Sequence, residues 1–364
     1  MSINILIVDD SRIFRRAVEE GLARETGIKV VGSVWNGIKA IEFIEATPPD
    51  IVTLDVQMPD MDGLQTLEAI QQINASRPSD RQIGVIMLSS HTKKGADITV
   101  QALQMGAFDF IPKPESRNLK ENILNLCRQL TVKIRNYASV HELPPGRQRD
   151  KLKKAKPQPV RGEAARSQSI AAGIRAILIG VSTGGPKALA EILPPLCAGI
   201  DVPIFIVQHM PPTFTESLAK SLNSKCRYTV RECTSGDFAR NRHAYIAPGG
   251  RHMLLSSEQR KIKTIIQDLP PEKGCRPSVD LLFRSAAQLF GNHVIGVILT
   301  GMGSDGTEGA RTLKELGGYI IAQDEESSVV WGMPGSAKAA GIVDEVLPLR
   351  EIPEAIIAML QKQG

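Results

Sequence analysis

The chain has 364 residues, of which 42% are hydrophobic, enough for two separately buried cores. Its formal net charge is +5, but residues 147–166 alone hold eight Lys or Arg against two acidic residues. The positive charge therefore belongs to one local stretch. Because the rest of the chain has no basic surplus that would bind a phosphate backbone, we expect no nucleic-acid partner.

Cysteine usage and hydropathy indicate the compartment. The five cysteines are odd in number and show no Cys-x-x-Cys spacing, which favours reduced thiols in a cytoplasmic protein. No apolar run approaches the length of a membrane span, and the first predicted strand starts within three residues of the N-terminus. We expect neither a signal segment nor membrane insertion.

In the first third of the chain, acidic residues follow two predicted strands. Ile3–Val8 ends at Asp9 and Asp10, and the run from Asp50 to Leu54 ends at Asp55. Three carboxylates at one sheet edge repel each other unless a hard divalent cation is held there. This pattern predicts a Mg²⁺ site with Asp9, Asp10 and Asp55 as ligands.

Two further predicted strands supply groups that bind a phosphoryl group. Ser89 follows the run 84–88, and Lys113 follows the run 108–111. With Mg²⁺ nearby, a hydroxyl and an ammonium complete a pocket in which Asp55 accepts phosphate and later loses it. Phe110 is either a core residue or an aromatic switch that changes rotamer when Ser89 moves.

Apolar periodicity stops between about Tyr137 and Gly173, where prolines lie among Arg and Lys. We interpret residues 126–173 as a helix end followed by a solvated basic linker. The basic run is interpreted as a soluble spacer, with contact to an acidic partner as the alternative. The predicted domains are then 1–125 and 174–364.

A serine flanked by glycines opens the second part of the chain. The segment Gly180–Gly185 follows the apolar run 174–179 and precedes a helical pattern that Pro186 opens. Ser182 is thus an exposed candidate nucleophile at a strand-to-helix turn. The same glycine-rich turn would equally suit a bound phosphate.

Two later apolar runs end in suitable partners for Ser182. The run 203–208 leads to His209, and the run 293–299 leads through residues 300–304 to Asp305. Because loops after parallel strands gather at one edge, a Ser182, His209 and Asp305 triad is expected. Its chain order differs from that of the usual serine-esterase fold. The backbone of residues 301–303 and the amides that open the helix at Pro186 are candidate oxyanion donors.

Four short segments predict a local antiparallel addition near one edge of the second sheet, where it helps to shape a substrate groove. They are 228–230, 242–246, 254–257 and 262–266. His243 and His252 lie among them without metal-ligand spacing, so we interpret both as structural and expect no catalytic metal.

These residues carry two resemblances. Residues 1–125 resemble a response-regulator receiver domain in the acidic pair, Asp55, the run Met58–Gly63, the hydroxyl position and Lys113-Pro114. Residues 174–364 resemble the catalytic domain of the CheB family of chemotaxis protein-glutamate methylesterases. The matching motifs are Gly180–Gly185, Gln208–Pro212, Ala244–Gly249, Arg276–Asp280, Leu299–Gly303, Asp305-Gly306 and Gly332–Pro334.

The resemblance implies an α/β fold throughout: a flavodoxin-like receiver domain followed by a doubly wound, mainly parallel α/β catalytic domain. Family members are phosphorylation-activated hydrolases that demethylate glutamate γ-methyl esters on methylated chemoreceptors, releasing methanol, and many deamidate selected glutamines. A chemotaxis histidine kinase is the expected phosphodonor. Mg²⁺ is implied for phosphorylation, and no cofactor for the esterase site.

The resemblance also assigns roles. Ser182 maps to the nucleophile, His209 to the base and Asp305 to its orienting acid, while Thr183 and Met302 map near the nucleophile and oxyanion. The chain departs from the family pattern in its long linker and at Ser304, where the common form has Asn. Neither departure alters the expected chemistry.

Two other function classes remain open at this point. A receiver domain often controls a DNA-binding output, but some 190 residues of alternating strand and helix lack a short basic recognition helix. A non-enzymatic docking module whose glycine loop binds a phosphate would leave His209 and Asp305 without roles.

Overall fold

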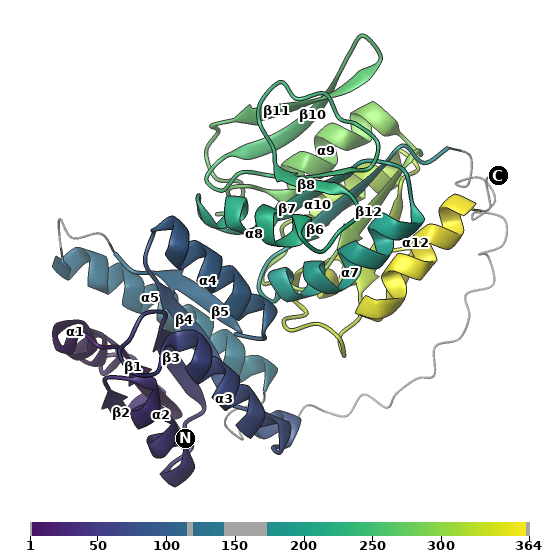
Figure 1. Ribbon diagram of the computed structural model, residues 1–364. Coiled ribbons are helices and arrows are strands. Elements are labelled where there is room, and N and C mark those ends of the chain that lie inside the picture. The colour runs from purple at the N-terminus through teal and green to yellow at the C-terminus, as the bar shows by residue number, and fades with distance from the viewer. Residues whose placement is uncertain (1, 115–118, 142–172, 362–364) are drawn as a thin grey trace. The chain divides into compact units, whose positions relative to one another are not determined.

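The computed structural model describes residues 2–114, 119–141 and 173–361 (Figure 1). They divide into two compact units whose sequence boundary falls at residues 158 and 159. The expected basic linker lies almost entirely within 142–172, outside the described residues. No helix of the described part of the chain is both long enough and apolar enough to cross a membrane.

The first unit alternates strands and helices around a five-stranded parallel sheet of order β2-β1-β3-β4-β5. Helices α1 and α5 pack together on one face, and α2, α3 and α4 pack in sequence on the other. This is the expected flavodoxin-like arrangement. The elements are β1 (Ile3–Val8), α1 (Arg12–Leu22), β2 (Ile28–Val34), α2 (Gly37–Ala46), β3 (Ile51–Asp55), α3 (Gly63–Ala75), η1 (Ser79–Arg81), β4 (Gly84–Ser89), α4 (Lys93–Gln104), β5 (Asp109–Pro112) and α5 (Leu119–Val140).

Helix α5 extends further than the loss of apolar periodicity suggested. Tyr137, where we expected the connector to begin, lies in its last turn and is buried. The Tyr137 ring packs edge-on against Phe108, with ring centroids 5.0 Å apart, and its hydroxyl donates to the Gln82 carbonyl at 2.7 Å. One aromatic anchor therefore keeps this turn folded against the first unit.

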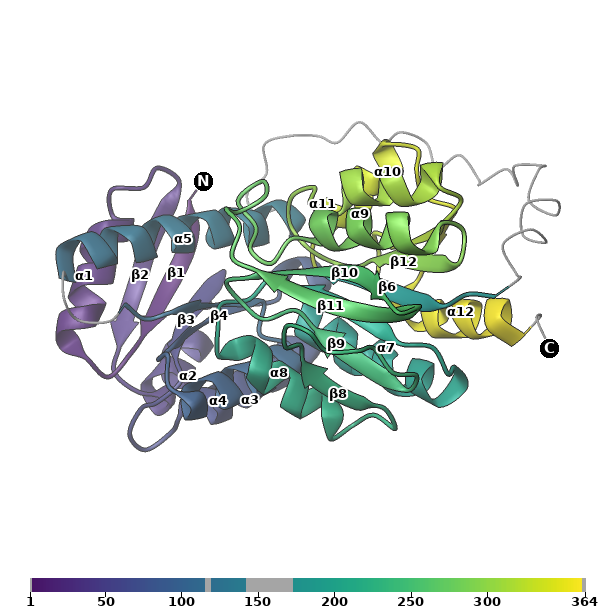
Figure 2. The same cartoon turned by 90° about the horizontal axis from the view of Figure 1, so that it is seen from above.

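The second unit is built on a seven-stranded sheet of order β14-β13-β12-β6-β7-β9-β8, with a separate β10–β11 hairpin. Helices α9, α10 and α11 cover one face and α7, α8 and α12 the other (Figure 2). The elements are β6 (Ala176–Val181), α7 (Gly185–Gly199), β7 (Ile204–Gln208), α8 (Phe214–Asn223), β8 (Thr229–Glu232), β9 (His243–Ile246), β10 (His252–Glu258), β11 (Lys261–Gln267), α9 (Val279–Phe290), β12 (Val294–Ile298), α10 (Thr307–Glu315), β13 (Tyr319–Gln323), α11 (Gly332–Ala339), β14 (Glu345–Leu347), η2 (Leu349–Glu351) and α12 (Ile352–Gln361).

The predicted antiparallel addition is only half right. Strands β8 and β9 pair in parallel with each other, and β9 pairs in parallel with β7, so both belong to the main sheet. Only β10 and β11 form an antiparallel hairpin. Short segments in which apolar and polar residues alternate do not reveal whether a strand runs parallel or antiparallel to its neighbour. That direction depends on the path of the connecting chain.

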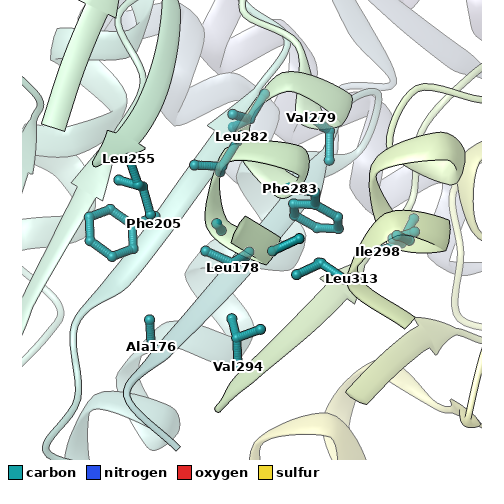
Figure 3. Packing of buried hydrophobic residues seen from close by; sticks show 14 of the residues in the cluster. Ala176, Leu178, Phe205, Leu255, Val279, Leu282, Phe283, Val294, Ile298 and Leu313 are labelled. Carbon is teal, nitrogen blue, oxygen red and sulfur yellow. The ribbon is translucent and has the colours of Figure 1, made fainter. Parts of the chain in front are cut away.

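The core of the second unit fills the space between the sheet and α9 (Figure 3). Alternate residues of β6, Ala176 and Leu178, face Val279 and Phe283 of that helix, and all four side chains are fully buried. Because strand side chains alternate in direction, the next position on this face is Gly180. A Cβ at Gly180 would lie 2.4 Å from Val279 Cγ1, so only glycine lets α9 begin this close to the end of β6.

This packing gives a first prediction. Gly180→Ala should lower the free energy of unfolding of the second unit by roughly 1–3 kcal/mol because the added methyl group overpacks the contact with Val279. Val279→Ala should also be destabilising, but the double variant should cost less than the sum of the two. Denaturant unfolding followed by Trp331 fluorescence in a Trp35→Phe background measures all three; strict additivity would contradict the contact.

Candidate functional site

An acidic pocket lies where the strand order of the first sheet reverses, between β1 and β3. Carboxylate oxygens of Asp9, Asp10 and Asp55 all lie within 4.8 Å of one another. Asp9 and Asp55 are buried and Asp10 is exposed. The Lys113 Nζ lies 2.6 Å from Asp9 Oδ2 and 2.7 Å from Asp55 Oδ2. The structure thus brings together all four residues predicted from strand ends.

One ammonium does not neutralise three carboxylates. Burial raises the pKa of Asp55 to about 6, with Lys113 opposing that rise and Asp9 adding to it. Burial lowers the pKa of Lys113, but Asp55 and Asp9 outweigh burial and the net shift is upward. Asp9 Oδ2, although close to the ammonium, has no hydrogen bond of normal geometry within the described residues. This oxygen-rich, under-compensated pocket fits a hard divalent cation.

The loop after Asp55 is fixed by close backbone packing. A Cβ at Gly63 would lie 2.1 Å from the Asp55 carbonyl oxygen, so the run Met58–Gly63 must end in glycine. Asp62 and Gln65 form a capping box at the start of α3. Asn36 donates to Asp60 at 2.9 Å, which ties the same loop to α2. Together these contacts hold the run Met58–Gly63 next to Asp55.

Ser89 lies on β4, which pairs with β3, and Phe110 lies on β5, the next strand at the edge of the sheet. Ser89 is fully buried, and its hydroxyl donates to the Gly95 carbonyl and accepts from the Thr99 hydroxyl at 2.6 Å. The Phe110 side chain is 6% exposed and lies inward on β5. In this conformation the Ser89 hydroxyl is bound to α4, so its contact with a phosphoryl group remains a prediction.

The three expected triad residues follow neighbouring strands of the second sheet. Ser182 comes after β6, His209 after β7 and Asp305 after β12, and these strands are adjacent in the order β12-β6-β7. The Ser182 N–H donates to the Thr300 carbonyl at 3.0 Å, and the His209 N–H to the Val181 carbonyl at 3.1 Å. The strand order reverses here, between β12 and β6, the position at which ligand sites of such sheets form.

The Asp305 carboxylate is buried and holds the imidazole directly. His209 Nε2 lies 2.8 Å from Asp305 Oδ2. The carboxylate also accepts from the Ser278 hydroxyl at 2.9 Å and from the backbone N–H groups of Val279 and Asp280 at 2.7 and 3.0 Å. Despite burial, these bonds and His209 hold the pKa of Asp305 below its usual range. Asp305 is therefore ionised and fixed.

Asp280 supports the same loop from α9. Its buried carboxylate accepts from the N–H groups of Gly306 and Gly309 at 2.9 and 2.7 Å, and pairs with Lys273 at 2.9 Å. Gly306 is the N-cap residue of α10, and because it has no side chain it cannot itself accept from the first N–H groups of the helix. The motif Arg276–Asp280 thus supplies hydrogen-bond donors to Asp305 and also, through Asp280, a cap for α10.

The two ring nitrogens of His209 are distinguished by Asp305. With Nε2 facing the carboxylate, Nδ1 is the nitrogen left to accept a proton. The half-buried Ser182 hydroxyl makes no hydrogen bond with a residue that the structure describes. Contacts between nucleophile and base are often loose without substrate and tighten in the complex.

The surroundings of His209 favour the protonated imidazole. Burial lowers the pKa of His209, but the hydrogen bonds and charges of Asp305 and Cys275 outweigh it and raise the pKa to about 9. At neutral pH an imidazolium–carboxylate pair is therefore favoured in most molecules. A base must be neutral, so only a minor fraction is ready to accept a proton.

The oxyanion expectation needs two corrections. The Gly185 N–H, at the start of α7, donates to the Ser182 carbonyl at 2.8 Å. The Gly301 N–H donates to the Val330 carbonyl at 2.9 Å and is not available to a substrate. Gly301 instead allows close packing, because a Cβ there would lie 2.7 Å from Ser182 Cβ. Thr183, half-buried, accepts at its carbonyl from the Thr300 hydroxyl, and Met302 is 42% exposed beside this turn. Their roles remain predictions.

Two residues near the triad escaped the sequence analysis. The buried Gln208 amide donates to the carbonyls of Ser182 and His209 at 2.9 and 3.3 Å. The Cys275 thiol lies within 4.8 Å of a ring nitrogen of His209 and a carboxylate oxygen of Asp305. Gln208 was visible as the polar end of an apolar run, whereas nothing in the spacing of Cys275 indicated this contact.

Comparisons with known proteins agree over both units. The sequence model for the CheB methylesterase matches residues 177–356, and that for the response regulator receiver domain matches residues 5–124. A relative from Trichodesmium erythraeum, named protein-glutamate methylesterase/protein-glutamine glutaminase, is 41% identical and covers 97% of both chains. One of the same name from Desulfotalea psychrophila is 40% identical over 98% of both.

A solved structure gives a further likeness. The crystal structure of the Thermotoga maritima CheB methylesterase catalytic domain is 42% identical, covers 52% of this chain and 99% of its own, and superposes with a TM-score of 0.49. The full-length relatives by themselves match through both units. The chain belongs to the CheB family, in which a response-regulator receiver domain precedes a methylesterase domain.

Proposed function

We propose that this chain is a phosphorylation-activated serine hydrolase that demethylates glutamate γ-methyl esters on chemoreceptors, releasing methanol, and deamidates selected glutamines. The convergence of Ser182, His209 and Asp305 on three adjacent strand ends carries this proposal. The names of the relatives, protein-glutamate methylesterase/protein-glutamine glutaminase, support the same reaction.

The geometry supports an acyl-enzyme route. Ser182 attacks the ester carbonyl while His209 Nδ1 takes the hydroxyl proton, and Asp305 stabilises the imidazolium through Nε2. Collapse of the tetrahedral species breaks the carbon–oxygen bond, and His209 returns the proton to methanol. Water then repeats the sequence, giving free glutamate and regenerating Ser182. With a glutamine side chain the leaving group is ammonia.

In the first unit, Asp55 is the proposed phosphoacceptor, with a chemotaxis histidine kinase as donor. Asp9, Asp10 and Asp55 would hold Mg²⁺, which when bound neutralises charge on the transferred phosphoryl group. Lys113 offers a second positive charge beside Asp55. Ser89 and Phe110 are the proposed switch residues, whose rearrangement reports phosphorylation.

The nucleophile assignment predicts a near-complete loss. Ser182→Ala should reduce methanol release from methylated chemoreceptor membranes by at least about a thousandfold, and His209→Gln should be comparably severe because the two act as one unit. The control is Ser256→Ala, a half-buried serine of the β10–β11 hairpin. Near-normal methanol release by the Ser182→Ala protein would exclude Ser182 as nucleophile.

The raised pKa of His209 predicts the pH profile. Because only neutral imidazole accepts the proton, kcat/KM should rise about tenfold per pH unit below the His209 pKa and level off near pH 9. Asp305→Asn should lower the rate and move the inflection to lower pH, since Asp305 raises that pKa. An inflection that stays unchanged in Asp305→Asn would show that another group titrates. Asparagine is preferable to alanine here because several buried donors need an acceptor.

Phosphorylation should depend on Asp55 and Mg²⁺, and basal hydrolysis on neither. A small-molecule phosphodonor should increase methanol release by the natural sequence and have no effect on Asp55→Ala. Glu68→Gln, which removes an exposed carboxylate from α3, should respond normally. Chelation of Mg²⁺ should abolish the response and leave the basal rate. A full response by Asp55→Ala would place the phosphate elsewhere.

The crowded carboxylates also predict a stability effect. The folded pKa of Asp55, about 6, exceeds the unfolded value of 3.8, so Asp55 makes stability fall as pH rises from about 4 to about 6. Above this range, without divalent cations, Asp55→Asn should stabilise the first unit by roughly 1–3 kcal/mol. Hydrogen exchange of β3 amides at pH 5 and pH 8 measures this. Mg²⁺ should stabilise the natural sequence more than the variant; a destabilised Asp55→Asn would contradict the charge argument.

A further inference from the structure

Cys275 occupies a fixed position beside the triad. It lies between β11 and α9, where its N–H donates to the Glu272 carbonyl at 2.8 Å and its carbonyl accepts from the Glu272 N–H at 3.1 Å. Three residues later, the Ser278 hydroxyl is bound to Asp305. The backbone is therefore anchored on both sides of the thiol.

The donor atoms around this position are of three kinds. One ring nitrogen of His209, the Cys275 sulfur and one carboxylate oxygen of Asp305 all lie within 4.8 Å of one another. Asp305 is buried, while His209 and Cys275 are partly exposed, so an ion can enter from solvent. Nitrogen, thiolate and carboxylate ligands on one side of an open position are the donor set that Zn²⁺ prefers.

We propose that His209, Cys275 and Asp305 form a Zn²⁺ site and that the bound ion inhibits the hydrolase. On binding, the Cys275 thiol and the imidazolium each release a proton to solvent, and His209 and the thiolate donate electron pairs to the metal. A water molecule fills the fourth position. Because the metal occupies the imidazole and carboxylate of the triad, the base cannot serve Ser182 as it does in the free enzyme.

The site requires a small local opening. His209 Nε2 and Asp305 Oδ2 are 2.8 Å apart, the spacing of a hydrogen bond. Ligands about 2 Å from a tetrahedral Zn²⁺ lie roughly 3.3 Å apart. The proton shared by the pair must therefore leave, and the imidazole must shift by a fraction of an ångström. Metal binding through Nε2 and Oδ2 therefore excludes the catalytic hydrogen bond between these two atoms.

The two clusters of metal-ligating groups in the described residues differ in chemistry. The pocket of Asp9, Asp10 and Asp55 offers only oxygen, which suits Mg²⁺, whereas the Cys275 cluster offers nitrogen and sulfur as well. Millimolar Mg²⁺ can thus occupy the first without protecting the second. This separation allows zinc to be tested on the whole chain.

The first test is zinc inhibition of methanol release in the presence of millimolar Mg²⁺, with each variant normalised to its own zinc-free rate. Cys275→Ser should need at least about tenfold more Zn²⁺ for half-inhibition. Cys226→Ser is the matched control, since Cys226 is also a half-buried thiol of the second unit, and it should keep the original sensitivity. Equal sensitivity of the natural sequence and Cys275→Ser would overturn the proposal.

The second test measures metal binding independently of enzyme activity. Co²⁺ in place of Zn²⁺ should produce a thiolate-to-cobalt absorption band in the full chain and in Ser182→Ala. The band should disappear in Cys275→Ser and weaken in His209→Gln, while Cys226→Ser keeps it. A band that persists in Cys275→Ser, or no band in the natural sequence, would also overturn the proposal.

The inhibitory part of this inference rests on the proposed function, whereas the metal site does not. A Cys275-dependent cobalt band in a chain that releases no methanol would support the site and reject the esterase assignment. A normal esterase without that band would reject the site alone. Cys275→His provides a rescue, since imidazole is also a zinc ligand: it should restore zinc inhibition without the thiolate band.

Discussion

The buried carboxylate of Asp305 is the constraint on which the catalytic unit depends. A charge taken out of water destabilises a fold unless hydrogen-bond donors replace the lost hydration. Here the donors come from the start of α9, from the loop before α10 and from His209. The same group that orients the base therefore also fixes two helices against the sheet, and Gly180 is needed so that α9 can approach closely enough.

The acidic pocket of the first unit solves the opposite problem. Its three carboxylates also meet at the reversal of a parallel strand order. Lys113 is the ammonium that pairs with two of them, and the backbone N–H groups of Ser11 and Gln57 donate to Asp9 and Asp55. Negative charge left uncompensated is costly for folding and useful for capturing a cation and a phosphoryl group. The two parallel sheets thus support different chemistry, because the charge of Asp305 is matched by hydrogen-bond donors whereas the charge of the Asp9, Asp10 and Asp55 cluster is matched only in part.

Residues at strand ends could be placed from the sequence, because a parallel sheet gathers them at one edge whatever the details of packing. This is why Asp9 and Asp55 lie close together in the first unit and His209 and Asp305 in the second, where Ser182 follows the adjacent strand β6. Contacts made by side chains across irregular segments could not be predicted in the same way. The Cys275 thiol and the Asp280 cap depend on how the chain between β11 and α9 folds back. The occupied Gly301 amide depends on the loop before α11, and the direction of β8 and β9 depends on their connection.

The Gln208 amide has a mechanical consequence. Its two hydrogen bonds clamp the carbonyl of the nucleophile to the carbonyl of the base, beside a pair of strands already in register at Val181 and Gln208. The two loops must then move as one rigid body. A conformational change that pulled Ser182 away from His209 would first have to break the two Gln208 hydrogen bonds. A tilt of the whole sheet edge, or the rotation of a single side chain on it, would leave both hydrogen bonds intact.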